Sequence, residues 1–120
     1  MRPPPANGNR FAAEPQIDMM AAAAGVAPLQ CRLNNTSDPR MLATLRAVAD
    51  AYGWEPSIAP GRSGRGRGLA SGIDAETYVE LVADVTVDSE TGAVKVDPVA
   101  CAQDMGVVVN ADGARIQLDG

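Results

Sequence analysis

The chain has 120 residues, a formal net charge of −5 and a composition that is 46% hydrophobic, which suits one domain of ordinary size. The acidic balance argues against general nucleic-acid binding, because such binding depends on excess positive charge. The absence of histidine excludes histidine-based zinc or haem sites and any Ser-His or Cys-His triad within this chain.

Two cysteines, Cys31 and Cys101, cannot by themselves complete a structural zinc or iron–sulfur site. We expect two buried, inert thiols, with a disulfide as the alternative. Alanine supplies 21 of the hydrophobic residues, so the core should be thin and its stability marginal. We expect no membrane span, because the apolar stretch of residues 19–26 is too short for one, and we find no signal peptide.

The first half of the chain carries helical patterns. Residues 11–24 predict a helix that ends at Gly25, and its regular part should begin near Pro15 because a proline inside a helix removes a hydrogen bond. A short helical turn is expected over residues 28–33. The predicted inward face of the first helix consists of Phe11, Ile17, Met20, Ala21 and Ala24.

The next helix is the clearest element of the sequence. Asp38 can cap its first turn, Pro39 occupies the first helical position and Gly53 follows its last periodic residue. The apolar side chains that repeat at three- and four-residue steps are Met41, Leu42, Leu45, Val48, Ala49 and Tyr52.

Residues 54–68 are rich in Gly, Pro, Ser and Arg and predict a solvated connector. Arg62, Arg65 and Arg67 are weak candidates for phosphate binding, since neither a P-loop nor a dinucleotide fingerprint is present. An RNA-binding role is not favoured, because no aromatic residues alternate with these arginines.

The second half predicts strands. Residues 78–87 alternate, and we expect the apolar set to face the core while Glu80 and Asp84 point to solvent. A turn at 88–92 should lead to an antiparallel strand over 93–102, with a third strand over 69–73 and a turn or the start of a helix at 110–113. The apolar set of the alternating strand is Val79, Leu81, Ala83, Val85 and Val87. The residues alone predict an α+β domain, with two helices followed by a small antiparallel sheet, and identify no catalytic group.

Several motifs occur in a characteristic order over nearly all 120 residues. The first is Met1-Arg2-Pro3-Pro4-Pro5-Ala6, followed by Asn9-Arg10-Phe11-Ala12 and the pattern Phe-Ala-x-Glu-x-x-Ile-Asp of residues 11–18. Further matches lie at 24–29, 32–34, 38–40, 53–54, 99–110 and 112–120. In this order they resemble the molybdopterin-binding large subunit of the molybdenum hydroxylases, the xanthine dehydrogenase/aldehyde oxidase family, and in particular its isoquinoline- and nicotinate-oxidising branch.

The resemblance implies an oxidoreductase that hydroxylates aldehydes or N-heterocycles with oxygen taken from water. The cofactor would be molybdopterin, in bacteria usually the cytosine dinucleotide form, and the protein would supply no metal ligand. Arg2 matches a loop arginine near the cofactor, Gln117 the glutamine that hydrogen-bonds the pterin, and Gly120 a glycine that permits close approach. The alternatives without a role in cofactor binding are that Arg2 is an ordinary terminal cation and that Gln117 is an exposed helix residue.

Some positions depart from the family pattern. Pro5 replaces a loop glycine, Pro15 replaces a serine and Ala111 replaces a proline. The family's catalytic Glu lies beyond the second cofactor segment and is not in this chain, so we predict no catalytic residue here and no activity of the chain alone. We also expect the chain alone to hold neither the cofactor nor a metal.

The resemblance also implies partners and a location. The remainder of the large subunit and a small [2Fe–2S] subunit would be the partners, in the cytoplasm or, for the parent enzyme, the periplasm. Residues 1–53 would come from the first cofactor-binding region and 69–120 from the start of the second, so the fragment would span their junction. The rival hypothesis is a stand-alone, non-catalytic α+β interaction domain derived from that family.

Overall fold

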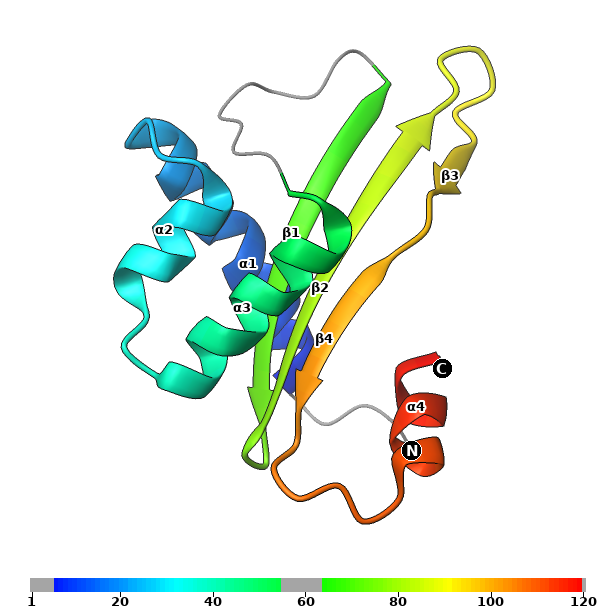
Figure 1. Ribbon diagram of the computed structural model, residues 1–120. Coiled ribbons are helices and arrows are strands. Elements are labelled where there is room, and N and C mark those ends of the chain that lie inside the picture. The colour runs from blue at the N-terminus through cyan, green and yellow to red at the C-terminus, as the bar shows by residue number, and fades with distance from the viewer. Residues whose placement is uncertain (1–5, 55–63, 120) are drawn as a thin grey trace.

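The computed structural model describes residues 6–54 and 64–119 (Figure 1). These residues form four helices and one four-stranded antiparallel sheet, which confirms the predicted α+β class. In chain order the elements are α1 (Ala6–Ala23), α2 (Pro28–Asn35), α3 (Pro39–Tyr52), β1 (Arg65–Asp74), β2 (Thr77–Val87), β3 (Val94–Val96), β4 (Ala100–Asp104) and α4 (Ala111–Asp119).

The long strand β2 is the centre of the sheet. β1 pairs with it along one side, and β3 and β4 pair with successive parts of its other side. The expected third strand at 69–73 is therefore present, but it begins at Arg65, so residues 65–68 of the predicted connector are strand. Representative register pairs are Leu69↔Val82, Val82↔Ala100 and Val85↔Val96.

The single strand predicted over residues 93–102 is wrong, because the structure divides this segment into β3 and β4. Pro98 lies between them and has no N–H to donate to a sheet ladder. Asp97 still donates its backbone N–H to the carbonyl of Asp84 at 2.9 Å, so the chain stays beside β2 while the regular pairing is interrupted.

α3 forms as the sequence predicted. The Asp38 side chain accepts hydrogen bonds from the backbone N–H groups of Arg40 and Met41, and Gly53 adopts the left-handed conformation at φ 67° that ends the helix. The buried side of α3 lies against one face of the sheet, where Leu45 and Val48 are fully buried. Packed around this core are Leu29, Leu33, Met41, Tyr52, Trp54, Leu69, Val82, Ala100 and Ala102.

The prediction of which side of β2 is buried is wrong. Glu80 and Val82 are 0% exposed beneath α3, whereas Leu81 is 39% exposed on the opposite face. Asp84 lies on the same side as Glu80 and is half-buried beside Arg67. A period of two separates the two faces of a strand, but which face is covered depends on where the helices pack.

The prediction for the first helix is also wrong in two respects. α1 begins at Ala6 and runs through Pro15. Pro15 has no N–H to donate to the carbonyl of Phe11, and both residues are exposed. Of the expected inward face only Ala21 is buried, and Phe11 is 84% exposed. The helix turns Glu14 inward instead, toward a buried arginine.

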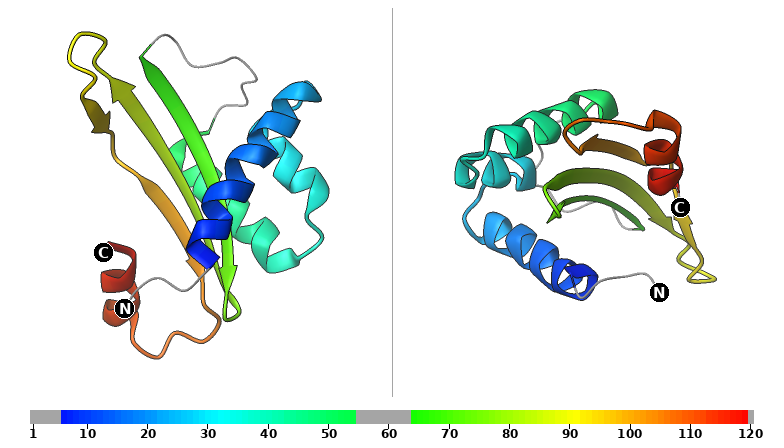
Figure 2. Two further views of the ribbon diagram at one scale, coloured as in Figure 1. Left: turned by 180° about the vertical axis from the view of Figure 1, so that it is seen from behind. Right: turned by 90° about the horizontal axis from the view of Figure 1, so that it is seen from below.

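α1 and α3 lie on opposite sides of the sheet, and α2 lies beside the β1 edge (Figure 2, right). α1 covers the second face only in part. A groove of about 350 Å³ remains between α1 and the sheet. Apolar side chains line it, including Phe11, Pro15, Leu81 and Ala83. On the same face of the sheet as Leu81, Val96 of β3 is 58% exposed. This outer face of the sheet, which α1 covers only in part, is therefore an open apolar surface.

Candidate cofactor-binding segment and its supports

The three residues predicted to bind the cofactor are not all described. Gln117 lies on α4 and is exposed. Arg2 and Gly120 lie outside the described residues, so their predicted roles remain predictions. The described part of the candidate site is therefore α4 and the contacts at its start.

α4 begins where the sequence predicted. The Asn110 side chain caps it by accepting the N–H of Gly113 at 2.9 Å, and Asp112 places a negative charge in the first turn, where the helix dipole favours it. No residue of α4 is buried, and Ile116 is 65% exposed. The helix follows the loop after β4 and lies beyond the end of that strand (Figure 1). Its position therefore depends on the chain segment that joins it to β4.

The root of that segment is an ion pair between Arg40 of α3 and Asp104, the last residue of β4. Arg40 Nη2 lies 2.7 Å from Asp104 Oδ1 and Nε lies 3.0 Å from Oδ2, a bidentate arrangement. Asp104 Oδ1 also accepts the N–H of Gly106 at 2.8 Å. Arg40 and then the Gly106 N–H lower the pKa of Asp104 to about 2, so this carboxylate stays ionised in any ordinary buffer.

Two further side chains hold Arg40 in place. Its guanidinium lies over the Tyr78 ring, 4.4 Å from the centroid, and the Tyr78 hydroxyl donates to Asp38 Oδ2 at 2.7 Å. This hydrogen bond lowers the pKa of Asp38 and raises that of Tyr78. Since Asp38 also caps α3, the first turn of that helix, the start of β2 and the end of β4 are joined in one polar network.

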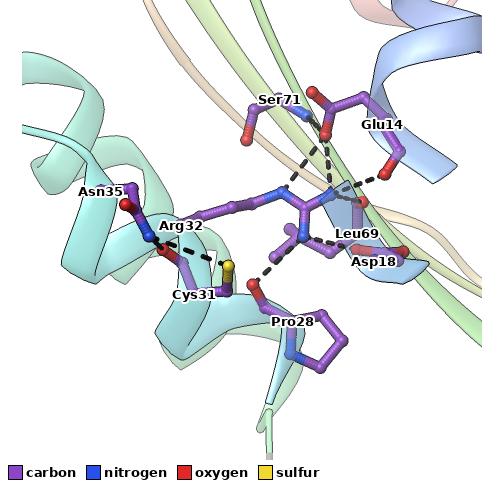
Figure 3. Close-up of polar contacts among 8 residues, drawn as sticks. All are labelled: Glu14, Asp18, Pro28, Cys31, Arg32, Asn35, Leu69 and Ser71. Atoms are coloured by element: carbon purple, nitrogen blue, oxygen red, sulfur yellow. Dashed lines mark hydrogen bonds and ion pairs between the residues drawn. The ribbon is translucent and has the colours of Figure 1, made fainter. Parts of the chain in front are cut away.

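A second arginine, Arg32 of α2, is buried where α1, α2 and β1 meet (Figure 3). Its Nη2 lies 2.8 Å from Glu14 Oε2 and its Nη1 lies 2.7 Å from Asp18 Oδ1. Nη2 also donates to the carbonyl of Leu69 at 3.1 Å, while Glu14 Oε2 accepts the N–H of Ser71 at 3.0 Å. Burial acts to lower the pKa of Arg32, but the two carboxylates outweigh it and the pKa is raised.

These contacts close part of the outer edge of β1. Edge strands present unpaired N–H and C=O groups, and here the helices' side chains satisfy the carbonyl of Leu69 and the N–H of Ser71. Arg10 adds a hydrogen bond to the carbonyl of Ile73 at 3.2 Å. The sequence patterns did not identify this cluster. The only signal was that Glu14 and Arg32 fall within motifs of the family resemblance.

Glu80 is a buried acidic residue on the face of the sheet that α3 covers. Burial raises its pKa to about 7, while the Ser71 and Thr44 side chains oppose this, the Glu14 carboxylate adds to it and Arg32 counters it. Thr44 Oγ1 lies 3.4 Å from Glu80 Oε1, and Glu80 Oε2 is buried without a hydrogen-bond partner within the described part of the chain. A protonated carboxyl suits this position better than an ionised one.

The other residues that the sequence singled out are the arginines considered for phosphate binding and the two cysteines. Arg67 is held by Asp84 through contacts of 2.8 and 3.0 Å and lies over the Tyr52 ring, while Arg62 lies outside the described residues. Both cysteines are free thiols, and the expectation that both are buried is wrong, because Cys31 is half-buried and Cys101 is exposed.

Residues 6–54 and 64–119 were searched for metal-binding clusters and for membrane-spanning helices. Within these ranges, no group of three or more acidic or cysteine side chains is arranged to hold a metal ion. Among the helices formed by the same residues, none is both long enough and apolar enough to cross a bilayer. The described residues thus offer a held helix with an exposed amide on it, rather than a set of reacting groups.

Comparisons with known proteins support the molybdenum hydroxylase family that the motifs of the chain indicated. Over its whole length it is 39% identical to a component of nicotinate dehydrogenase from Pseudomonas putida. Over 92% of its length it is 33% identical to the beta chain of isoquinoline 1-oxidoreductase from Brevundimonas diminuta. The chain spans 11% and 14% of the lengths of these relatives. No family model matches it.

Proposed function

We propose that the chain is a segment of the large subunit of a molybdopterin-dependent oxidoreductase that hydroxylates aldehydes or N-heterocycles with oxygen from water. The observation that carries the proposal is the similarity of the entire chain to part of the Pseudomonas putida nicotinate dehydrogenase. The segment would span the junction of the two cofactor-binding domains of the large subunit.

The cofactor we propose is molybdopterin, in its cytosine dinucleotide form, which supplies the molybdenum centre at which the substrate is oxidised. Gln117 suits such a group, because its amide both donates and accepts hydrogen bonds and lies on an exposed helix. Arg2 and Gly120 would complete this chain's share of the binding site. The role of these residues is to bind and orient, since the catalytic Glu of the family has no counterpart here.

The proposed partners are the remainder of the large subunit and a small [2Fe–2S] subunit that accepts the electrons. The assembled enzyme would work in the cytoplasm or the periplasm. We expect the chain alone to be inactive and to lose the cofactor. The open apolar face of the sheet agrees with this proposal, because such a surface in a small domain marks a contact with another protein surface.

A second function, that of a stand-alone, non-catalytic interaction domain, is favoured by one observation. The described residues form their own core, and Arg32 ties α1 and α2 to the sheet. The genomic neighbourhood separates the two hypotheses. A neighbouring coding sequence for the catalytic Glu segment or for a two-cluster ferredoxin-like subunit supports the enzyme, and an isolated coding sequence supports the interaction domain.

The direct experiment is a replacement. This chain would be substituted for the matching segment of the Pseudomonas putida relative, and the chimera produced with the other components of that enzyme. We expect molybdenum in the purified chimera and nicotinate-dependent dye reduction, with the native relative as the positive control and a segment-deleted version as the negative one. A chimera that folds and assembles but holds no more molybdenum than the deletion would contradict the proposal.

A further inference from the structure

We propose that Arg40 is a positioning residue that, through its ion pair with Asp104, sets where α4 lies and hence where Gln117 presents its amide. This inference rests on the proposed function for the identity of the ligand, but not for the structural relation between Arg40 and α4.

The first observation is that α4 has no buried side chain of its own. It is joined to the sheet through residues 105–110, where Val107 and Val109 are 90% and 95% exposed. Because α4 lacks a buried face, the direction of the segment that leads into it contributes to where the helix lies. The direction of that segment is set where it leaves β4, at Asp104.

The second observation is the geometry at that point. Asp104 is held on both carboxylate oxygens by the Arg40 guanidinium, and Arg40 Nη2 also lies 3.3 Å from the Asp104 carbonyl oxygen. A planar fork that contacts both the side chain and the backbone of one residue restricts its rotation more than a single contact does. Gly106 then turns the chain at φ 73°, a conformation that residues with a side chain rarely adopt.

The third observation is that Arg40 is itself fixed from the helical half of the chain. It lies in the first turn of α3, shortly after the cap Asp38, and its guanidinium is stacked on the Tyr78 ring. The buried side of α3 packs on the sheet core, so the anchor of the pair is part of the rigid layer of the molecule. Arg40 therefore connects the helical half to the segment that carries the proposed cofactor contact, across 64 positions of sequence.

The chain also offers a matched control. Arg67 and Asp84 form a bidentate pair with the same degree of exposure, side chains 39% and 31% exposed against 36% and 34% for Arg40 and Asp104. That pair also stacks on a tyrosine ring, Tyr52, but joins β1 to β2 far from α4 in the fold. A general loosening of the chain would appear in both variants, and a positioning role only in one.

The experiment measures the distance between α3 and α4 in the full chain by pulsed electron spin resonance. Spin labels would be attached at Asp50→Cys and Arg115→Cys, both exposed, after Cys31→Ala and Cys101→Ala. We expect one narrow distance peak in this parent and in Arg67→Met, loss of that peak in Arg40→Met, and an intermediate width in Arg40→Lys, which keeps the charge but not the fork. An unchanged peak in Arg40→Met, or equal broadening in Arg67→Met, overturns the proposal.

The second arm measures molybdenum in the chimera described above. We expect Arg40→Met to lower the molybdenum content of the chimera about tenfold, the lower end of the effect of outer-shell partners on metal sites, while Arg67→Met leaves it unchanged. A lost distance peak with normal molybdenum in Arg40→Met overturns the link to the ligand. A parent chimera that holds no molybdenum contradicts the proposed function instead. The distance measurement still decides whether Arg40 sets the position of α4.

Discussion

Two arginines join parts of this chain that are far apart in sequence, and they differ in their exposure to solvent. Arg32 is buried with its side chain 3% exposed and ties α1 and α2 to β1, whereas Arg40 is 36% exposed and ties α3 to the end of β4. A buried charge that loses its partner is costly, while a half-exposed pair can be replaced by water. Arg32 therefore stabilises the fold, whereas Arg40 positions one segment.

The largest effect expected from this comparison follows the loss of the buried arginine. Arg32→Met leaves the Glu14 carboxylate buried without its cation, which costs roughly 3–5 kcal/mol of unfolding free energy. In a small domain with a thin core this loss is enough to unfold most of the population. Chemical denaturation would measure it, with Arg10→Met, which removes one surface hydrogen bond, as the control. A loss below about 1 kcal/mol would refute the assignment of Arg32 to stability.

The second effect concerns Glu80, which lies on the helix-covered face near the Arg32 cluster. Its pKa is raised from 4.5 to about 7 in the folded chain, so the folded state binds the proton more tightly than the unfolded state. Stability should therefore be greatest below pH 4.5 as far as Glu80 is concerned, and fall as the pH rises to 7, by about 3 kcal/mol at most. Asp104, with a pKa of about 2, stays ionised throughout this window.

Urea unfolding at pH 5, 6, 7 and 8 would test this prediction, with Glu80→Gln as the variant. We expect the variant to lose the pH dependence and to be more stable than the parent at pH 8. Equal slopes against pH in the parent and the variant would show that Glu80 is already ionised in the folded chain.

A smaller effect is expected from the exposed pairs. Arg40→Met and Arg67→Met should each lower the unfolding temperature only slightly and by similar amounts, far less than Arg32→Met, because water and salt screen both pairs. Thermal unfolding followed by circular dichroism would check it. If Arg40→Met were as destabilising as Arg32→Met, the distinction between the two arginines would fail.

The smallest effect on stability is expected on the outer face of the sheet. We expect the isolated chain to self-associate through this open apolar surface. Val96→Lys, at a position 58% exposed, should leave the unfolding temperature nearly unchanged but reduce that association, since a charge interrupts the surface. Sedimentation velocity would measure the association, with Val107→Lys, exposed but outside the sheet, as the control. Equal association in both variants would place the contact elsewhere.

The parts of the fold that the sequence predicted are those with a local cause. Asp38, Pro39 and Gly53 define the ends of α3 through contacts within a few residues, and Asn110 starts α4 in the same way. The alternation of residues 78–87 predicted β2 in the same way, and the polar turn at 88–92 predicted its antiparallel pairing with the next strand.

The parts that were missed depend on contacts across the chain. Alternation separated the faces of β2, but only the packing of α3 decides that Glu80 lies inside and Leu81 outside. Likewise, the inward turn of Glu14 in α1 requires Arg32, which is 18 positions away. The candidate site was predicted from resemblance for Gln117, whereas the Arg40–Asp104 pair is a juxtaposition that only the folded chain shows.

We propose that Gln117 on α4 binds the molybdopterin cofactor, and the molybdenum content of the assembled enzyme would show whether it does. The molybdenum content would be compared in chimeras that carry Gln117→Ala and Gln16→Ala, the latter removing an exposed glutamine from α1. We expect a marked loss of molybdenum in Gln117→Ala and none in Gln16→Ala. Equal molybdenum in both, in chimeras that assemble normally, would contradict it.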